Sequence, residues 1–286
     1  MAAHLQSSPD RIGVGGDDRY RRIQELFRSG PGDARVLTYR GVQVGSAYQP
    51  IYELGGGTLA GHEALLRCSN EEIDPHSLFQ VSDYYYETLD VDDAVRILHL
   101  ENYAALAPAG NGRIFVKTHP QTLSNPVKAE TLSYCIESLG LSWEGVALEL
   151  AEDQVEDLDA VSRAVEPFRA RGCAIVANGY DVGCSNLERV WMLRPDFVKF
   201  ERSMLPTHLQ VPDPAALLGG LAATFRGAGI RTVMKGVETW ADLEATLEAG
   251  IEYAQGYYLQ PPIRDAVPDA GAEHLPVALE RFRRRA

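Results

Sequence analysis

Short apolar, β-branched runs alternate with amphipathic helical segments along most of this chain, and this alternation constrains the fold more than any other feature. The later runs lie at residues 112–119, 145–152, 172–180, 195–202, 230–238 and 252–259. The segments between them have the three-to-four-residue spacing of apolar side chains typical of helices, and several end at glycine. Strands that alternate with helices pair in parallel through crossover helices, so the pattern predicts an α/β fold.

The first two runs differ from the others, because only a glycine triplet separates them. Residues 46–54 and 59–67 flank residues 55–57, which predicts a hairpin, and residues 74–107 are expected to form two helices. About eight strands in total favour a (β/α)8, TIM-type barrel over an open doubly wound sheet. No G-x-G-x-x-G motif follows the first strand, which argues against dinucleotide binding.

The beginning of the chain lacks this pattern. Residues 1–35 are rich in Gly, Asp, Arg and Ser, and within them only residues 17–27 have helical character. We therefore expect a flexible N-terminal arm with one short helix at 1–35, followed by the barrel domain at 36–286.

Composition and charge exclude several classes of protein. With 286 residues, 45% of them hydrophobic, the chain can bury a large core. A net charge of −13 argues against nucleic-acid binding, and no apolar run is long enough to span a bilayer or to act as a signal peptide. The four cysteines form neither a close ligand pair nor a disulfide framework, which suits a cytoplasmic protein.

Polar side chains recur where the predicted strands end. They are Glu63, Lys117, Glu152, Asn178, Lys199, Glu201, Lys235, Glu238 and Gln255. In barrels of this type the C-terminal ends of the strands form the active face. Charged groups near a barrel mouth must be paired or bound, because an isolated buried charge is costly. This recurrence predicts a ligand site at the mouth of the barrel.

Several motifs resemble those of the EAL-domain family. The matching segments are "YQPIYEL", "GTLAGHEALLRC", "LELAED", "PDFVKFERSML" and "KGVETWADLEATLEAGIEYAQGYYLQPP", in collinear order from about Ala47 to Pro262. The family comprises bacterial cyclic di-GMP phosphodiesterases and their inactive relatives. The resemblance therefore implies a modified (β/α)8 barrel of the EAL type and a role in cyclic di-GMP signal transduction.

The same resemblance indicates which catalytic positions are kept. Active members hydrolyse the dinucleotide with two divalent cations held by carboxylates. By this comparison the retained positions are Glu63, Glu152, Lys199 and Glu238, and the substituted positions are Lys117, Asn178, Gly179 and Lys235. Three carboxylates and three ammonium groups then give the site a formal charge of zero. We therefore expect a degenerate site without metal, without Mg²⁺ or Mn²⁺ as cofactor and without catalysis, in which Lys117 and Lys235 pair with Glu63 and Glu152.

Three functions remain open. The first is a receptor that binds cyclic di-GMP without cutting it, through Gln49, Glu63, Leu65, Arg67, Lys199, Glu238 and Gln255. The second is a protein–protein interaction regulator that no longer binds the nucleotide. The altered segment 178–187 favours it, because the resemblance links this segment to dimerisation, so a homodimer is also expected to be possible. The third is a residual phosphodiesterase that would need Mg²⁺ or Mn²⁺.

Overall fold

A closed eight-stranded barrel forms the centre of the molecule in the computed structural model, which describes residues 15–70, 72–107, 112–151, 157–181, 187–268, 272 and 274–284. The barrel strands are β3 (Val42–Glu53), β4 (Thr58–Cys68), β5 (Arg113–Lys117), β6 (Val146–Ala151), β7 (Ala174–Tyr180), β8 (Phe197–Phe200), β9 (Arg231–Met234) and β10 (Tyr253–Ala254). Neighbours from β4 to β10 pair in parallel, whereas β3 pairs antiparallel with both β4 and β10. The predicted barrel and its opening hairpin are confirmed. A hairpin connection forces antiparallel pairing, so β3 is the one reversed strand.

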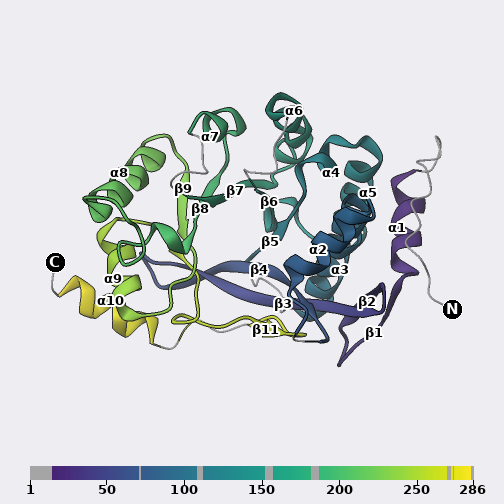
Figure 1. Ribbon diagram of the computed structural model, residues 1–286, viewed down its shortest axis with the longest axis horizontal. Coiled ribbons are helices and arrows are strands. Elements are labelled where there is room, and N and C mark those ends of the chain that lie inside the picture. Colours follow the sequence, from purple (N-terminus) through teal and green to yellow (C-terminus); the bar gives the residue numbers. More distant parts are fainter. Residues whose placement is uncertain are drawn as a thin grey trace.

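Helices surround the strands on the outside of the barrel (Figure 1). They are α2 (Pro75–Tyr84), α3 (Thr88–Leu106), α4 (Pro120–Ser124), α5 (Pro126–Ser138), α6 (Leu158–Arg169), α7 (Leu187–Leu193), α8 (Pro214–Gly227), α9 (Trp240–Glu248) and α10 (Leu275–Arg283), and short 3-10 turns lie at Trp143–Gly145 and Arg202–Met204. Side chains of Asp74, Asn125, Asp157, Asp213 and Thr239 cap five helices by accepting backbone N–H groups. In the described part of the chain, no helix combines the length and apolarity needed to cross a membrane.

The barrel interior below the mouth is apolar. Its core consists of Ile51, Phe115, Ala147, Ala174, Val176, Phe197 and Val233. Phe115 and Phe197 contact edge to face with ring centroids 5.6 Å apart. Arg113 and Arg231 lie over the Phe197 ring from the N-terminal ends of β5 and β9, whereas the mouth is at the C-terminal ends of the parallel strands.

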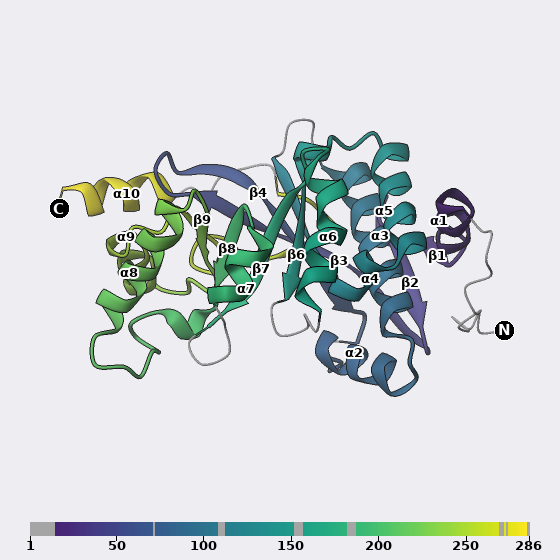
Figure 2. The same ribbon diagram turned by 90° about the horizontal axis from the view of Figure 1, so that it is seen from above.

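The segment before the barrel differs from the flexible arm expected at residues 1–35. The short helix is present as α1 (Gly16–Gln24), but Tyr20, Ile23 and Phe27 are buried against the rest of the fold. After it, β1 (Phe27–Ser29) pairs with β2 (Arg35–Tyr39), and β2 extends the sheet from β3. From residue 15 onward this segment is therefore packed on the domain, at the rim seen on the right of Figures 1 and 2. Residues 1–14 lie outside the described part.

A further short strand follows the barrel. Strand β11 (Ile263–Arg264) pairs antiparallel with β3 at Tyr48 and Ala47. It lies along the lower edge of the molecule in Figure 1, where β3 and β4 also run. Strand β3 thus pairs both with β2, which precedes the barrel, and with β11, which follows it.

Candidate functional site

Lys199 lies at the centre of a buried ionic cluster in the barrel mouth. It projects from β8, is fully buried, and its Nζ lies 2.6 Å from Glu63 Oε2 and 2.6 Å from Glu149 Oε1. Burial opposes the charge on Lys199, but the carboxylates of Glu149 and Glu63 outweigh it and raise the pKa above the ordinary lysine value. The side chain therefore stays an ammonium ion between two strands that are far apart in the sequence.

Both carboxylate oxygens of Glu63 are engaged by nitrogen donors. Oε2 also accepts from the amide of Gln255 at 2.5 Å, and Oε1 lies 3.3 Å from Nζ of Lys117. Burial acts to raise the pKa of Glu63, but Lys199, Lys117 and Lys235 together hold it well below its usual range. The predicted Lys117–Glu63 pair is thus present, although the Lys117 side chain is 56% exposed.

Glu149 is a site residue that the sequence interpretation missed. The motif comparison predicts Glu152, three positions further along, as the second carboxylate, and Glu152 lies outside the described residues. Residues alternate across a strand, so Ala147 and Glu149 of β6 face the interior while Leu148 and Leu150 pack against the helices. This alternation is visible in the sequence and could have identified Glu149 as an inward-facing residue. Burial and the nearby Glu63 carboxylate raise the pKa of Glu149 against the effect of Lys199, and its Oε2 has no hydrogen-bond partner in the described part.

Lys235 belongs to a second cluster and not to the first. It follows β9, and its Nζ lies 2.6 Å from Glu201 Oε1 and 3.3 Å from Asn178 Oδ1. Lys235 therefore does not pair with Glu63, and the expected pairing with Glu152 lies outside the described residues. Strands β8 and β9 are neighbours, so residues just beyond their ends meet directly.

Gly179 shapes the strand beside this second cluster. It has φ of +89° and lies where the pairing of β7 with β8 slips between Asn178 and Tyr180. A Cβ added at Gly179 would stand 3.7 Å from Glu201 Oε1, which is ordinary contact, so backbone conformation and not space favours glycine here. Gly179, predicted as a substituted catalytic position, thus forms a bulge next to Asn178, which accepts from Lys235.

The remaining predicted ligand residues lie around the first cluster, with one exception. Gln49 stands opposite Glu63 in the β3–β4 register and accepts from Gln255 at 3.3 Å. Leu65 and Arg67 follow on the same face of β4 and are half-buried. Glu238 instead pairs with Arg202 at 2.5 Å in a partly exposed position, with 43% and 38% of the two side chains exposed. The ligand-binding roles of these residues stay predictions.

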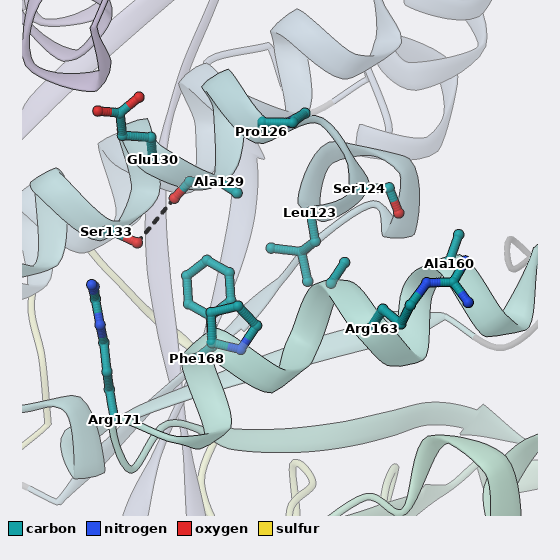
Figure 3. A pocket seen from close by; sticks show the side chains of 12 residues that line it. Leu123, Ser124, Pro126, Ala129, Glu130, Ser133, Ala160, Arg163, Phe168 and Arg171 are labelled. Carbon is teal, nitrogen blue, oxygen red and sulfur yellow. Dashed lines mark hydrogen bonds between the residues drawn. The ribbon is translucent and has the colours of Figure 1, made fainter.

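A separate hollow lies on the outside of the barrel, between α5 and α6. It has a volume of about 590 Å³ and is lined by apolar side chains such as Leu123 and Phe168 together with Arg163 and Arg171 (Figure 3). None of the carboxylates or lysines of the mouth lines it. Among the described residues, no three acidic, histidine or cysteine side chains are gathered as metal ligands. The ionic mouth is therefore the better candidate site.

Comparisons with known proteins agree with the barrel fold described above. The family model described as "EAL domain" matches residues 38–262. The chain is 27% identical over 224 residues to the cyclic di-GMP phosphodiesterase RocR of Pseudomonas aeruginosa, a match that covers 76% of this chain and 56% of RocR. The chain spans about half or less of the length of such curated relatives.

Solved structures of low sequence identity share the fold. The Bacillus subtilis YkuI protein, which has an EAL domain and was solved with cyclic di-GMP and calcium, matches with a TM-score of 0.72 at 22% identity, over 85% of this chain and 62% of that one. A standalone EAL protein of Vibrio cholerae in its cyclic di-GMP-bound form matches with a TM-score of 0.70 at 21% identity, over 82% of this chain and 98% of that one.

Proposed function

The chain belongs to the EAL-domain family, and from this premise we propose that it is a receptor that binds cyclic di-GMP without hydrolysing it. The relatives support the ligand, since RocR is named a cyclic di-GMP phosphodiesterase and the YkuI and Vibrio cholerae structures hold the dinucleotide. The observation that carries the proposal is the state of the carboxylates at the mouth. Nζ of Lys117, a substituted position, lies 3.3 Å from Glu63 Oε1, and Lys199 and Gln255 already engage Oε2, so neither oxygen of Glu63 is left free for a cation.

The donor set does not fit a two-metal centre. Such a centre needs several oxygen ligands around two divalent ions about 4 Å apart. Here both oxygens of Glu63 and one oxygen of Glu149 face nitrogen donors, and Lys117 and Lys235 stand at two positions implied for ligation or catalysis. A divalent cation 4 Å from one ammonium would be repelled by about 8 kcal/mol at an effective dielectric constant of 20. We therefore assign no metal-dependent step to this chain.

The same positive groups suit an anionic ligand. Cyclic di-GMP carries two phosphate charges, which Lys and Arg side chains bind through charge-assisted hydrogen bonds. Lys117 is 56% exposed and lies 3.3 Å from Glu63, so it can turn to a phosphate without breaking the buried Lys199 cluster. Arg67 is half-buried on the same face of β4, and no ion pair joins it to another described residue. These two side chains supply net positive charge at the mouth.

Calorimetric titration with cyclic di-GMP in the presence of EDTA tests binding directly. We expect saturable heat with an affinity that EDTA does not change, and a loss of affinity in Lys117→Gln and Arg67→Gln. Arg40→Gln is the matched control, because Arg40 lies outside the mouth and pairs with Glu87. No heat and no thermal shift at high micromolar ligand would refute the receptor function. Linear dinucleotide formed with Mg²⁺ or Mn²⁺ above background would refute the loss of catalysis.

A protein partner is the second candidate function, because α7 presents apolar side chains to solvent. Leu187, Trp191 and Met192 are each about 40% exposed. Another protein or a second copy of this chain would bury these side chains by binding to this face. Light scattering of the parent and of Trp191→Ala tests the homodimer: a parent that is monomeric at all concentrations excludes it.

A further inference from the structure

A buried chain of ion pairs connects helix α1 with helix α3. Arg19 of α1 donates to Asp93 Oδ2 at 3.0 Å, and Asp93 Oδ1 accepts from Arg96 at 2.6 Å. Arg96 in turn donates to Asp92 Oδ2 at 2.8 Å. These four side chains, Arg19, Asp93, Arg96 and Asp92, are called the α1–α3 ion network below.

The network ends at the turn that follows Lys117. Asp92 Oδ1 accepts from the backbone N–H of His119 at 3.2 Å, and Oδ2 accepts from the hydroxyl of Thr122 at 3.0 Å. The N–H of Thr118 donates to the backbone oxygen of Glu149 at 2.9 Å. The turn is thus held by Asp92 on one side and by the strand of Glu149 on the other. Asp92 is therefore bonded to the segment that directly follows Lys117 in the chain.

Burial makes the members of this network depend on one another. The side chains of Asp93 and Arg96 have no exposed surface, so neither can exchange its partner for water. Asp93 is shared by Arg19 and Arg96, so removing Arg19 leaves the buried Asp93 carboxylate with Arg96 alone and weakens the compensation of its charge. Arg19 is the member nearest to solvent, with 22% of its side chain exposed. A displacement of α1 acts first on the Arg19–Asp93 pair, which joins α1 to the pairs that Arg96 makes within α3.

Helix α1 lies at the rim of the molecule, on the far side of α3 and α5 from the barrel strands (Figures 1 and 2). It is held there by polar contacts as well as by its apolar face. The hydroxyl of Tyr20 donates to Glu101 of α3 at 2.9 Å, and Arg19 also bonds to Asp90 at 2.9 Å. A peripheral helix with ionic attachments can shift at lower cost than an element of the core.

We propose that Arg19, Arg96 and Asp92 are positioning residues for Lys117, so that the docking of α1 sets the affinity of the barrel mouth for an anionic ligand. The proposal rests on the proposed function only for the identity of that ligand. Coupling requires that the two sites share an element which both can displace, and here this element is the turn from Lys117 to Thr122. A protein that binds or pulls α1 would then change ligand affinity without touching the mouth.

The substitution Arg19→Gln, with Arg21→Gln as matched control, tests this coupling. Arg21 lies on the same helix, but its ion pairs with Asp17 and Asp18 stay within α1. Two readouts are needed: calorimetric affinity for cyclic di-GMP and amide hydrogen exchange of residues 112–124. For Arg19→Gln we expect an affinity loss of about 2- to 30-fold, with faster exchange in 112–124. Arg21→Gln should match the parent, and Arg19→Lys should recover part of the loss.

Three outcomes would overturn the proposal. The first is unchanged exchange in 112–124 for Arg19→Gln. The second is equal effects of the two substitutions. The third is faster exchange throughout β7 to β9, because Arg19 would then only stabilise the fold. If the parent protein does not bind cyclic di-GMP, the proposed function fails, but the exchange comparison still decides the coupling. Asp92→Asn gives an independent check, since it should loosen the same turn while α1 stays docked.

Discussion

Replacing Lys199 with methionine tests the ionic cluster at the mouth. Methionine keeps most of the side-chain volume and removes the charge that lies 2.6 Å from both Glu63 and Glu149. Two buried carboxylates then face each other without their shared cation. Breaking a buried ion pair in this way costs about 3–5 kcal/mol, against a total stability of about 5–15 kcal/mol for a typical domain. We expect Lys199→Met to lower the free energy of unfolding by about 3–5 kcal/mol at pH 7.5.

The pH dependence of this loss follows from the pKa values of the two carboxyls. In the parent, Lys199 is the largest of the charges that hold the pKa of Glu63 below its ordinary value, so Glu63 adds stability above pH 4.5 that is lost as the pH falls through its folded-state pKa. Without Lys199 the folded-state pKa of Glu63 rises, and that of Glu149, already raised by burial, rises further. Groups with raised pKa values bind protons on folding, so the variant regains stability on acidification.

Urea unfolding followed by circular dichroism at pH 7.5, 6.5 and 5.5 measures the effect. The difference between parent and variant should be largest at pH 7.5 and should shrink toward pH 5.5. The double variant Lys199→Met/Glu149→Gln is the matched control, because it removes the second buried charge and should recover about half of the loss. A loss below about 1 kcal/mol, or one that does not change with pH, would refute a mutually dependent buried cluster.

Three further predictions concern neighbouring residues. Glu201→Gln should release Lys235 from its 2.6 Å ion pair. We expect the affinity for cyclic di-GMP, measured by calorimetry at low salt, to increase about 3- to 10-fold. Unchanged affinity would mean that Lys235 does not face the ligand. Gly179→Ala should cost about 1–2 kcal/mol in urea unfolding because φ is +89°, whereas Gly220→Ala, within α8, should stabilise or be neutral. Glu238→Gln should lower stability by less than about 1 kcal/mol in the same assay, because its ion pair with Arg202 is partly exposed to solvent. A larger loss would refute this weak contribution.

The barrel could be predicted from the sequence because its determinants are local. Alternating strand and helix patterns imply parallel pairing, and the short link at residues 55–57 already requires the reversed strand β3. The docking of α1 could not be read from composition, since the Gly, Asp and Arg content of residues 1–35 concealed the apolar spacing of Tyr20, Ile23 and Phe27. These three apolar side chains form a buried face only because α3 and α5 provide a surface against which α1 packs.

The charged partners at the mouth were only partly predictable. Lys117 and Glu63 pair as expected because β4 and β5 are adjacent. The choice between Glu149 and Glu152 depends on where β6 ends and which face is inward, and the partner of Lys235 depends on the ends of β8 and β9. Such pairings join residues 34 to 136 positions apart, so they follow from strand register and not from any local pattern.

Strand β10 has a consequence for how the barrel opens. It is joined to β3 by two residue pairs, Tyr253 with Glu53 and Ala254 with Tyr52, and to β9 by two more. Local unfolding begins where the fewest hydrogen bonds must break. The pairing of β10 with β3, called the seam here, should therefore open more often than the rest of the barrel. Gln49 of β3 and Gln255 after β10 stand on opposite sides of the seam and bond to each other. A ligand that binds both amides would hold β3 and β10 together. Ligand binding at the mouth should then slow amide hydrogen exchange along β10.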